Sequence, residues 1–431
     1  MITFGEWCWG TSFYHIGSHY GFLFFRCPAS FYNRPLLENY LSECDNNKSI
    51  DSIVKAAEDY KSGIRKEIWP TGFESLDGML DGGFRGSQLI CVGAISSLGK
   101  TSWVLQIASQ IAEQGKDVLI FSLEMSRDEL NAKTISRYSY IRRLEKAQKM
   151  EYFDEDLELF TTSEILKGDI YKNQDKEPFP QYSLCETAFQ ESVAKARAIA
   201  PHTFIVVGNN DISVDEIKSI TENHIKVTGR KPIVIVDYLQ IISPSANSIQ
   251  KHYDIRRSTN DDITSLKVLA RNNDIPIVVI SAFNRASYTD PVSMGSFRES
   301  SGIEYSADVL FGLQYFGMDF ESSGYHDKEG NHVDGTESTT THVVRVNRLF
   351  EEMQDIAAKG EKQAIDLKIM KNRNGSRGTL AFHFTPKYNY FEEPQCPRDD
   401  TSKTKKNAKK PSQPKSKNRS QEMSSRLYCD D

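Results

Sequence analysis

Residues 87 to 102 constrain the fold of this chain more than any other stretch. An apolar run, Gln88-Leu89-Ile90-Cys91-Val92-Gly93, precedes the turn Ala94-Ile95-Ser96-Ser97-Leu98-Gly99-Lys100-Thr101 and an amphipathic stretch. The strict phosphate-binding loop asks for Gly, four residues and then Gly-Lys-Ser/Thr. Position 94 is Ala here and Gly93 comes one residue early, so the pattern has one departure. The segment predicts a buried strand, a phosphate-binding loop and a helix in succession.

The residue types in this loop suit a nucleoside triphosphate, ATP, with Mg²⁺. Gly99 permits a compact turn whose backbone N–H groups face the phosphates, Lys100 suits the β and γ oxygens, and Thr101 offers a hydroxyl to Mg²⁺. The predicted nucleotide-binding residues are Ala94, Ser96, Ser97, Gly99, Lys100, Thr101 and Ser102. The alternative is an ordinary glycine-containing turn between a strand and a helix.

Further apolar runs predict the rest of a sheet. Residues 117–125, 204–207, 233–240 and 275–281 read as strands, with helical segments between them. Near-continuous apolar runs are typical of strands that are buried on both faces of a sheet. This alternation predicts an α/β fold with a mostly parallel, twisted sheet and helices on both faces. Residues 307–315 and 365–370 predict further strands, and 379–391 alternates like an antiparallel edge; residues 316–340 predict a surface excursion.

Two carboxylates follow predicted strands. Asp237 ends the run Ile233-Val234-Ile235-Val236, and Glu124 ends the strand after the phosphate loop. The carboxyl ends of parallel strands meet in one crevice, so both acids are expected beside the loop. Asp237 is the candidate Mg²⁺ ligand together with Thr101, and Glu124 the candidate base for an attacking water. The alternatives are that Asp237 only starts a turn and that Glu124 caps the helix that begins at Ser126.

Composition limits the classes of function. The net charge of −6 combines a tail, residues 401–431, of about +6 with a remainder of about −12. An acidic body argues against broad coating of nucleic acid but allows a locally basic channel. No apolar run is long enough to span a membrane, and no signal peptide is evident. Seven scattered cysteines suit a reducing cytosol, so a cytoplasmic location is expected.

Four parts are predicted along the chain. Residues 1–48 form an irregular, aromatic-rich lead segment, 49–64 a helix with one apolar face, 65–393 the nucleotide-binding domain and 394–431 a basic disordered tail. The lead segment holds a possible zinc set, and unligated side chains are the default interpretation. Its members are Cys8, His15, His19 and Cys27. The tail is interpreted as a flexible electrostatic tether for DNA or as a merely solubilising terminus.

Six motifs in order carry a specific resemblance. They are Thr71-Gly72 with Leu76-Asp77, Ser97 to Thr101, Phe121 to Ser126, Asp237-Tyr238-Leu239-Gln240, Arg298-Glu299-Ser300 with Ile303-Glu304 and Ala307-Asp308, and Lys371 to Gly375. Together they resemble the C-terminal, RecA-like motor domain of the DnaB-type replicative helicases over roughly residues 65–392. The resemblance implies a RecA-like P-loop NTPase fold and a homo-oligomer, a hexameric ring, with ATP bound between subunits. It also implies movement along single-stranded DNA to unwind duplex during replication.

The resemblance also implies roles for residues. Lys100 and Glu124 would be catalytic, and Lys371 and Arg373 would reach into the neighbouring subunit's site. The basic string around them could instead be a solvated hairpin. Arg298, Glu299 and Ser301 would line the DNA channel, and residues 243–257 are the candidate for a second DNA-facing loop.

Two departures from the family bear on these expectations. The family ends the strand after Asp237 in Ser-Gln, where the Gln senses the γ-phosphate, and this chain has Ser281-Ala282. An Ala side chain forms no hydrogen bond, so coupling to DNA is expected to weaken or to pass through Asn284 or Arg285. The usual N-terminal collar, which binds primase, is also missing from residues 1–48. The helix at 49–64 resembles only the linker that docks on the next subunit, and a primase or helicase loader remains an expected partner.

A second class of function stays open. An ATP-gated module of the RecA, RadA or KaiC kind would bind single-stranded DNA or act in recombination without unwinding it. Ala282 and the missing collar favour this alternative, whereas Glu124, Lys371 and Arg373 favour the motor.

Overall fold

The computed structural model describes residues 46–63, 66–170, 180–208, 212–242, 255–284, 287–297, 300–319, 325–326, 332–333 and 339–394. The chain divides into two units, Met1–Glu67 and Ile68–Asp431. The described part of the first unit is a helix, α2 (Asn46–Lys61), close to the predicted range of 49–64. Its residues Ile50, Ile53 and Val54 are each at least half exposed. The apolar face predicted for this helix is therefore present on an exposed surface.

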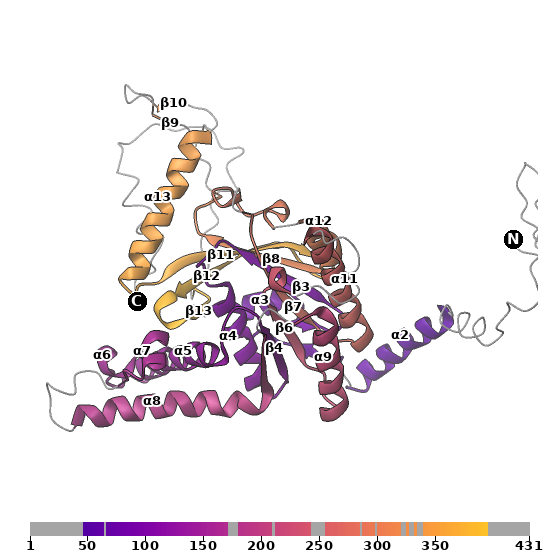
Figure 1. Cartoon of the computed structure of the whole chain (residues 1–431), viewed down its shortest axis with the longest axis horizontal. Coiled ribbons are helices and arrows are strands. Elements are labelled where there is room, and N and C mark those ends of the chain that lie inside the picture. Colours follow the sequence, from indigo (N-terminus) through magenta and orange to yellow (C-terminus); the bar gives the residue numbers. More distant parts are fainter. Residues whose placement is uncertain are drawn as a thin grey trace, which may run out of the picture. The chain divides into compact units, whose positions relative to one another are not determined.

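The second unit is built on a nine-stranded sheet in the order β13-β12-β11-β8-β3-β7-β6-β4-β5 (Figure 1). The strands are β3 (Leu89–Ala94), β4 (Val118–Ser122), β5 (Thr203–Val207), β6 (Ile233–Asp237), β7 (Ile277–Ala282), β8 (Val309–Tyr315), β11 (Gln363–Asn372), β12 (Gly378–Thr385) and β13 (Tyr390–Glu392). Neighbouring strands from β8 to β5 run parallel, and β11, β12 and β13 add antiparallel pairs. The mostly parallel sheet and the antiparallel edge are both confirmed.

Helices cover both faces of this sheet. Its central strands are therefore buried along their whole length. In Figure 1, α4, α5 and α8 lie to one side of the sheet and α9, α11 and α12 to the other. Their bounds are α3 (Glu74–Met79), α4 (Lys100–Glu113), α5 (Arg127–Gln148), α6 (Glu155–Glu158), α7 (Thr162–Lys167), α8 (Pro180–Ile199), α9 (Val214–Thr228), α11 (Ile255–Asn273), α12 (Ser300–Ser306) and α13 (Thr339–Ala358). Two small antiparallel pairs and short 3₁₀ turns complete the described elements. The pairs are β1 (Ile68–Trp69) with β2 (Phe84–Arg85) and β9 (Tyr325–His326) with β10 (His332–Val333).

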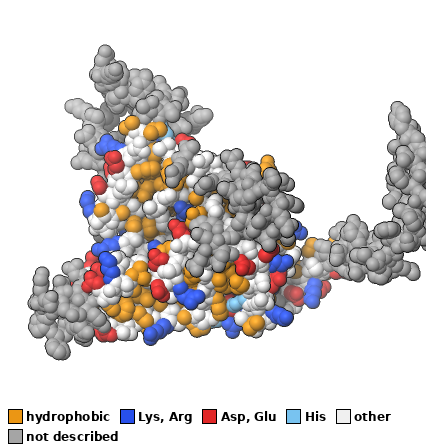
Figure 2. Space-filling model, viewed as in Figure 1, with side chains coloured by type: hydrophobic (Ala, Val, Ile, Leu, Met, Phe, Trp, Pro, Cys, Tyr) orange, Lys and Arg blue, Asp and Glu red, His pale blue; other side chains and the backbone are white. Residues whose placement is uncertain are grey.

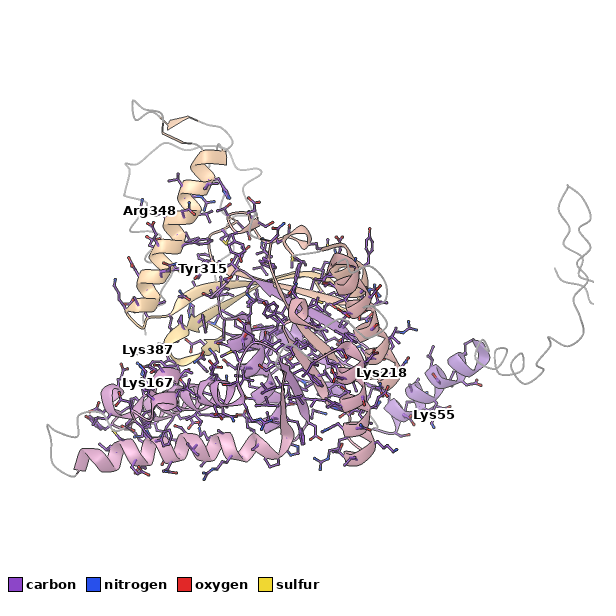
Figure 3. The ribbon with its side chains drawn as sticks, viewed as in Figure 1. Lys55, Lys167, Lys218, Tyr315, Arg348 and Lys387 are labelled. Carbon is purple, nitrogen blue, oxygen red and sulfur yellow. The ribbon has the colours of Figure 1, made fainter. Side chains whose placement is uncertain are left out.

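The helix α13 was not predicted. The sequence suggested a polar excursion to about residue 340, and no element was assigned between it and the strand near residue 365. Instead α13 packs onto the sheet through buried Val346, Leu349 and Met353. The ring of Phe350 meets that of Tyr315 at the end of β8, with centroids 5.6 Å apart, beside the lower part of the helix (Figure 3).

The edge hairpin β12–β13 reaches the helix of the phosphate loop. The side-chain amide of Gln106 on α4 donates to the carbonyl of Phe391 and accepts from its N–H, both at 2.8 Å. The outermost strand of the sheet, β13, is thus hydrogen-bonded to α4.

On the face seen in Figure 2, acidic and basic side chains are interspersed among the described residues, and no broad field of one charge is visible there. Among the described helices, none combines the length and the hydropathy that crossing a membrane requires.

Candidate nucleotide-binding site

The phosphate loop turns between β3 and α4 in the way its glycine requires. Gly99 is the N-cap residue of α4 and has φ = 83°, in the left-handed region that favours glycine. A Cβ at this position would lie 2.7 Å from Phe384 Cε1 and Cζ, because the hairpin packs on the loop. The close approach of the hairpin therefore demands glycine as firmly as the backbone angle does.

Lys100 is held inside the loop. Its Nζ donates to the carbonyls of Ala94 and Ile95, both at 3.1 Å. Burial lowers the pKa of Lys100, while the carboxylates of Asp237 and Glu124 act in the opposite direction. The ammonium curls over the turn at which a phosphate would sit, so it is positioned to transfer its hydrogen bonds to phosphate oxygens.

The other predicted loop residues differ in exposure and contacts. Ala94 is buried at the end of β3, while Ser96 and Ser97 are exposed on the turn. Ser102 faces away from the solvent, and its hydroxyl donates to Asn389 Oδ1 at 2.9 Å. Ser102 thus secures α4 to the hairpin, and its side chain is engaged there.

Thr101 and Asp237 meet directly beside the loop. The Thr101 hydroxyl donates to Asp237 Oδ2 at 2.8 Å. Burial raises the pKa of Asp237 to about 6, with the nearby Glu124 charge adding to the rise and the Thr101 hydrogen bond opposing it. Asp237 pairs across the sheet with Ser122 at the end of β4, so the expected meeting of strand ends is confirmed.

Glu124 lies two residues beyond β4 and is exposed. It is not the cap of α5, because Ser126 and Glu129 form a reciprocal capping box at that helix start. The Ser126 hydroxyl accepts from the Glu129 N–H, and the Glu129 carboxylate accepts from the Ser126 N–H. Glu124 therefore presents its carboxylate to solvent at the same edge as the phosphate loop.

The donor set at Thr101 and Asp237 fits Mg²⁺. Hydroxyl and carboxylate oxygens are hard ligands, and adjacent oxygens around Mg²⁺ lie about 3 Å apart when each is about 2.1 Å from the metal. The 2.8 Å separation of these two atoms is close to that value. Among the described residues, no group of three or more His, Cys, Asp or Glu side chains is arranged to hold a metal. The possible zinc set, Cys8, His15, His19 and Cys27, lies outside the described residues.

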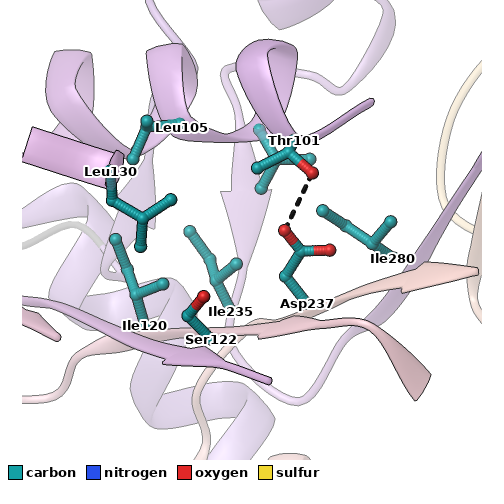
Figure 4. A pocket seen from close by; sticks show the side chains of 9 residues that line it. Thr101, Leu105, Ile120, Ser122, Leu130, Ile235, Asp237 and Ile280 are labelled. Carbon is teal, nitrogen blue, oxygen red and sulfur yellow. Dashed lines mark hydrogen bonds between the residues drawn. The ribbon is translucent and has the colours of Figure 1, made fainter. Parts of the chain in front are cut away.

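A small cavity lies beneath Thr101 and Asp237 between α4, α5 and the sheet (Figure 4). Besides Thr101, Asp237 and Ser122, its lining is aliphatic: Val104, Leu105, Ile120, Leu130, Ile235 and Ile280. Such a lining offers few hydrogen-bond donors to a phosphate. We attribute the cavity to packing under the helix and place the phosphate site above it, at the loop.

Lys371 and Arg373 lie towards the opposite end of the parallel strands from the phosphate loop. In the register, Lys371 is level with Leu310 and Asn372 with Val309, at the start of β8, whereas Ala94 is level with Leu313. Lys371 Nζ donates to the Glu304 carbonyl, and Arg373 Nη2 to the Tyr305 carbonyl at 2.9 Å. Burial lowers the pKa of Lys371, and the neighbouring Arg373 charge adds to this. Neither cation is placed at the phosphate loop of its own chain.

The Asp308 of the Ala307-Asp308 motif has a structural role. Its carboxylate accepts from the N–H of Leu89 at 2.8 Å and pairs with Lys267. It also pairs with Arg373 at 3.3 Å. This buried acid therefore joins the start of β3, α11 and the basic turn after β11.

The predicted DNA-facing residues are mostly outside the described part of the chain. This is the case for Arg298, Glu299 and nearly all of 243–257, while Ser301 belongs to α12. Ala282 ends β7 as predicted. The Gln240 side chain occupies that strand end, where it donates to Ser281 Oγ at 2.8 Å and accepts from the Ala282 N–H at 3.4 Å.

Three side chains at the site were missed from the sequence. Lys133 on α5 donates to Asn389 Oδ1 at 2.8 Å, and burial lowers the pKa of Lys133. Tyr288 bonds the Ser96 hydroxyl through its own hydroxyl at 3.1 Å. None of these three residues stands in one of the six sequence motifs.

The fold and the site together define a RecA-like P-loop NTPase. The strand order and the Lys100–Thr101–Asp237 arrangement carry this assignment. The chain belongs to the DnaB-like helicase C-terminal domain family, whose model matches residues 69–393.

Named relatives agree with this assignment. The chain is 27% identical over 368 residues to the replicative DNA helicase DnaB of Helicobacter pylori (strain ATCC 700392 / 26695), covering 82% of this chain and 66% of the relative. It is 26% identical over 333 residues to DnaB of Geobacillus stearothermophilus, covering 75% and 56%. The alignments thus span between about half and two thirds of the length of these relatives.

Solved structures support the fold. One solved ATPase domain aligns with a TM-score of 0.57 at 18% identity, over 80% of this chain and 98% of that chain. A DnaB-like replicative helicase, described with its interactions with primase, aligns with a TM-score of 0.53 at 20% identity, over 79% and 65%.

Proposed function

We propose that the chain is an ATP-dependent DNA helicase of the DnaB type. It would hydrolyse ATP at subunit interfaces, move along single-stranded DNA and unwind duplex during replication. The residues Lys100, Thr101, Asp237 and Glu124 form what we call the phosphate cradle. The observation that carries the proposal is that this cradle and the cations Lys371 and Arg373 lie at opposite ends of the parallel strands. A copy that offers its cradle at one end of the strands and its cations at the other is complete only when copies adjoin head to tail. Such contacts form a closed ring when the rotation between successive copies closes and a filament when it does not, and we propose the ring.

Each cradle residue has one task in this proposal. Lys100 neutralises the β and γ oxygens, and Thr101 with Asp237 holds Mg²⁺, which when bound neutralises charge on the same oxygens. Glu124 orients a water and accepts its proton, because it is an exposed carboxylate at the same edge. The residues 65–393 act as the motor in this proposal.

Lys371 and Arg373 complete the site of the next copy. They stabilise charge that develops on the transferred phosphoryl group, and an arginine in this position is worth about 10³ to 10⁵ in rate. Asp308 and the carbonyls of Glu304 and Tyr305 hold the two side chains at the surface until a neighbour arrives.

The proposal includes the partners and the location. The assembly is a hexameric ring around single-stranded DNA, with Arg298, Glu299 and Ser301 facing the DNA. A primase or helicase loader is the partner, and the cytoplasm is the location.

The exposed face of α2 would dock on the neighbouring copy, since Ile50, Ile53 and Val54 are otherwise left in water. The tail, residues 394–431, would tether DNA electrostatically; deleting residues 401–431 should then flatten the salt dependence of DNA affinity.

Purified protein should hydrolyse ATP faster when single-stranded DNA is added and should separate a forked duplex. Lys100→Ala should abolish both activities, whereas Lys167→Ala, on the exposed end of α7, should leave both unchanged. Hydrolysis that is indifferent to single-stranded DNA, together with an intact fork, would falsify the helicase proposal.

The second candidate is an ATP-gated module that binds single-stranded DNA without unwinding it. Ala282 favours it, because the residue at this position carries no side-chain amide of its own and the Gln240 amide at this strand end is bonded to Ser281 and Ala282. Its signature is ATP-dependent DNA binding that persists in Glu124→Gln, with no strand displacement by the parent protein.

A further inference from the structure

Tyr288 touches the phosphate loop from a segment that leads towards the predicted DNA-facing residues. Its hydroxyl lies 3.1 Å from the hydroxyl of the exposed Ser96, and its ring packs against the core. The two residues are 192 positions apart, so the fold alone brings them together. Tyr288 belongs to the segment Ser287–Phe297, which we call the strap and which ends one residue before Arg298.

The strap is a defined structure held at several points. The Val292 N–H donates to Gln314 Oε1 at 2.9 Å, and the Asn284 N–H donates to the Ser296 carbonyl at 2.8 Å. The Phe297 ring meets that of Phe283 edge-on, at 5.1 Å between centroids. The middle of the strap is therefore fixed to β8 and its C-terminal end lies fixed beside β7, so Tyr288 belongs to a short, packed segment.

The strap also contacts α13. Nε2 of His342 lies 2.8 Å from the Thr289 carbonyl, and Arg345 Nη2 lies 3.2 Å from His342 Nδ1. Because Nε2 of His342 donates to that carbonyl, Thr289 is anchored next to Tyr288. The helix that the sequence did not predict thus supports the residue that reaches the phosphate loop.

We propose that the Tyr288–Ser96 hydroxyl pair reports phosphate occupancy of the loop to the strap. A tyrosine or serine hydroxyl donates one hydrogen bond and accepts others. When phosphate oxygens enter the loop, Tyr288 donates to a phosphate oxygen and accepts from Ser96, so that one bond becomes two. The added bond involves a charged acceptor and stabilises the strap in its ordered position.

Tyr288 is a positioning residue in this inference, and its link to DNA rests on the proposed function. A ligand shifts a conformational equilibrium only through contacts that differ between the states. The contact that differs here is the bond from Tyr288 to phosphate. The strap, up to Phe297 next to the predicted DNA-facing residues, would then be held in one position when phosphate is bound and released afterwards.

Hydrogen exchange on the full chain tests the inference without DNA. Adding Mg²⁺ and a non-hydrolysable ATP analogue should slow amide exchange in the strap by about tenfold or more, the size expected of a charge-assisted hydrogen bond. In Tyr288→Phe, which keeps the ring, this slowing should vanish while α4 still gains protection. Tyr152→Phe, an exposed control, should behave like the parent protein.

The outcomes separate this inference from the helicase proposal. Equal slowing of the strap in the parent and in Tyr288→Phe, or no slowing in the parent, would overturn the role of Tyr288. With DNA, the ratio of stimulated to unstimulated hydrolysis should fall about fivefold in Tyr288→Phe, and Ser96→Ala combined with it should add little further, because the two hydroxyls act as one unit. A parent protein that shows the strap response but no unwinding refutes the helicase proposal and supports the hydroxyl pair.

Discussion

The hydroxyl of Thr101 and the carboxylate of Asp237 are joined by a 2.8 Å hydrogen bond between the phosphate-loop helix and the strand β6. These residues are 136 positions apart in the chain. Their contact places two hard oxygen atoms side by side next to the loop. It also leaves Asp237 almost fully buried, with consequences for both stability and pH dependence.

Ionised Asp237 should destabilise the protein in the absence of Mg²⁺. Its pKa is about 6 in the folded chain, against an ordinary value of 3.8, so the folded state binds the proton more tightly. This stabilisation is present at low pH and is lost as pH rises through about 6, at a cost of about 2 to 3 kcal/mol. Asp237→Asn should therefore raise the melting temperature at pH 8 without metal, whereas Asp261→Asn, on an exposed position, should not.

The same acid should make activity depend on pH. Protonated Asp237 is a poor Mg²⁺ ligand, so Mg²⁺-dependent hydrolysis should fall about tenfold per pH unit below the pKa of about 6. Raising the Mg²⁺ concentration should shift the midpoint to lower pH, because the metal competes with the proton. A hydrolysis rate that changes by much less than about tenfold between pH 5 and 7 would argue against Asp237 as a metal ligand.

Glu124→Gln should separate binding of ATP from its hydrolysis. The amide keeps the shape but cannot accept a proton from water, so hydrolysis should fall by about 10² to 10⁴. Binding of a fluorescent ATP analogue should change less than about threefold, since the phosphate contacts are left in place. Glu151→Gln, also exposed, is the matched control. Equal loss of binding and turnover would show that Glu124 holds the loop rather than the water.

Two inactive variants should restore activity when mixed. Lys100→Ala loses the cradle and keeps the cations, whereas Arg373→Ala keeps the cradle and loses a cation. In randomly mixed rings about one quarter of the head-to-tail interfaces would combine an intact cradle with intact cations. ATP hydrolysis should therefore recover towards about a quarter of the parent rate, provided that interfaces act independently.

The control for that mixture lies on the same turn. Arg377 is exposed and stands four residues after Arg373, and Arg377→Ala alone should retain activity. No recovery on mixing, with subunit exchange verified by fluorescence transfer, would show that Arg373 acts within its own chain.

Gly99→Ala should be costly for two reasons. The positive φ costs about 1 kcal/mol for a residue with a Cβ, and the methyl group would meet Phe384 at 2.7 Å. The free energy of unfolding should fall by about 2 to 4 kcal/mol. Gly229→Ala has a similar φ of 68° and nothing within 4 Å of the added Cβ, so it should lose only about 1 kcal/mol. Equal losses in urea denaturation would mean that the hairpin yields to the methyl group.

The sequence by itself determined the sheet and the core of the site. The loop from Ala94 to Thr101 and the acids Asp237 and Glu124 each follow an apolar strand, and parallel strands deliver their carboxyl ends to one edge. Such local patterns carry their own geometry, because strand, turn and helix are contiguous in the chain. The placement of Lys371 at the other end of the strands from the phosphate loop, and its bond to the Glu304 carbonyl, were not predicted from the sequence.

Only the tertiary structure decided the contacts between distant segments. Asn389 and Ser102 are 287 positions apart, and Ser96 and Tyr288 are 192 apart. No periodicity or motif links such pairs, because their adjacency depends on how the hairpin and the strap pack over the loop. The helix α13 is a different case, because its buried residues Val346, Leu349 and Met353 are spaced as on one face of a helix. The local sequence carried this signal, and only the packing partners of that face needed the tertiary structure.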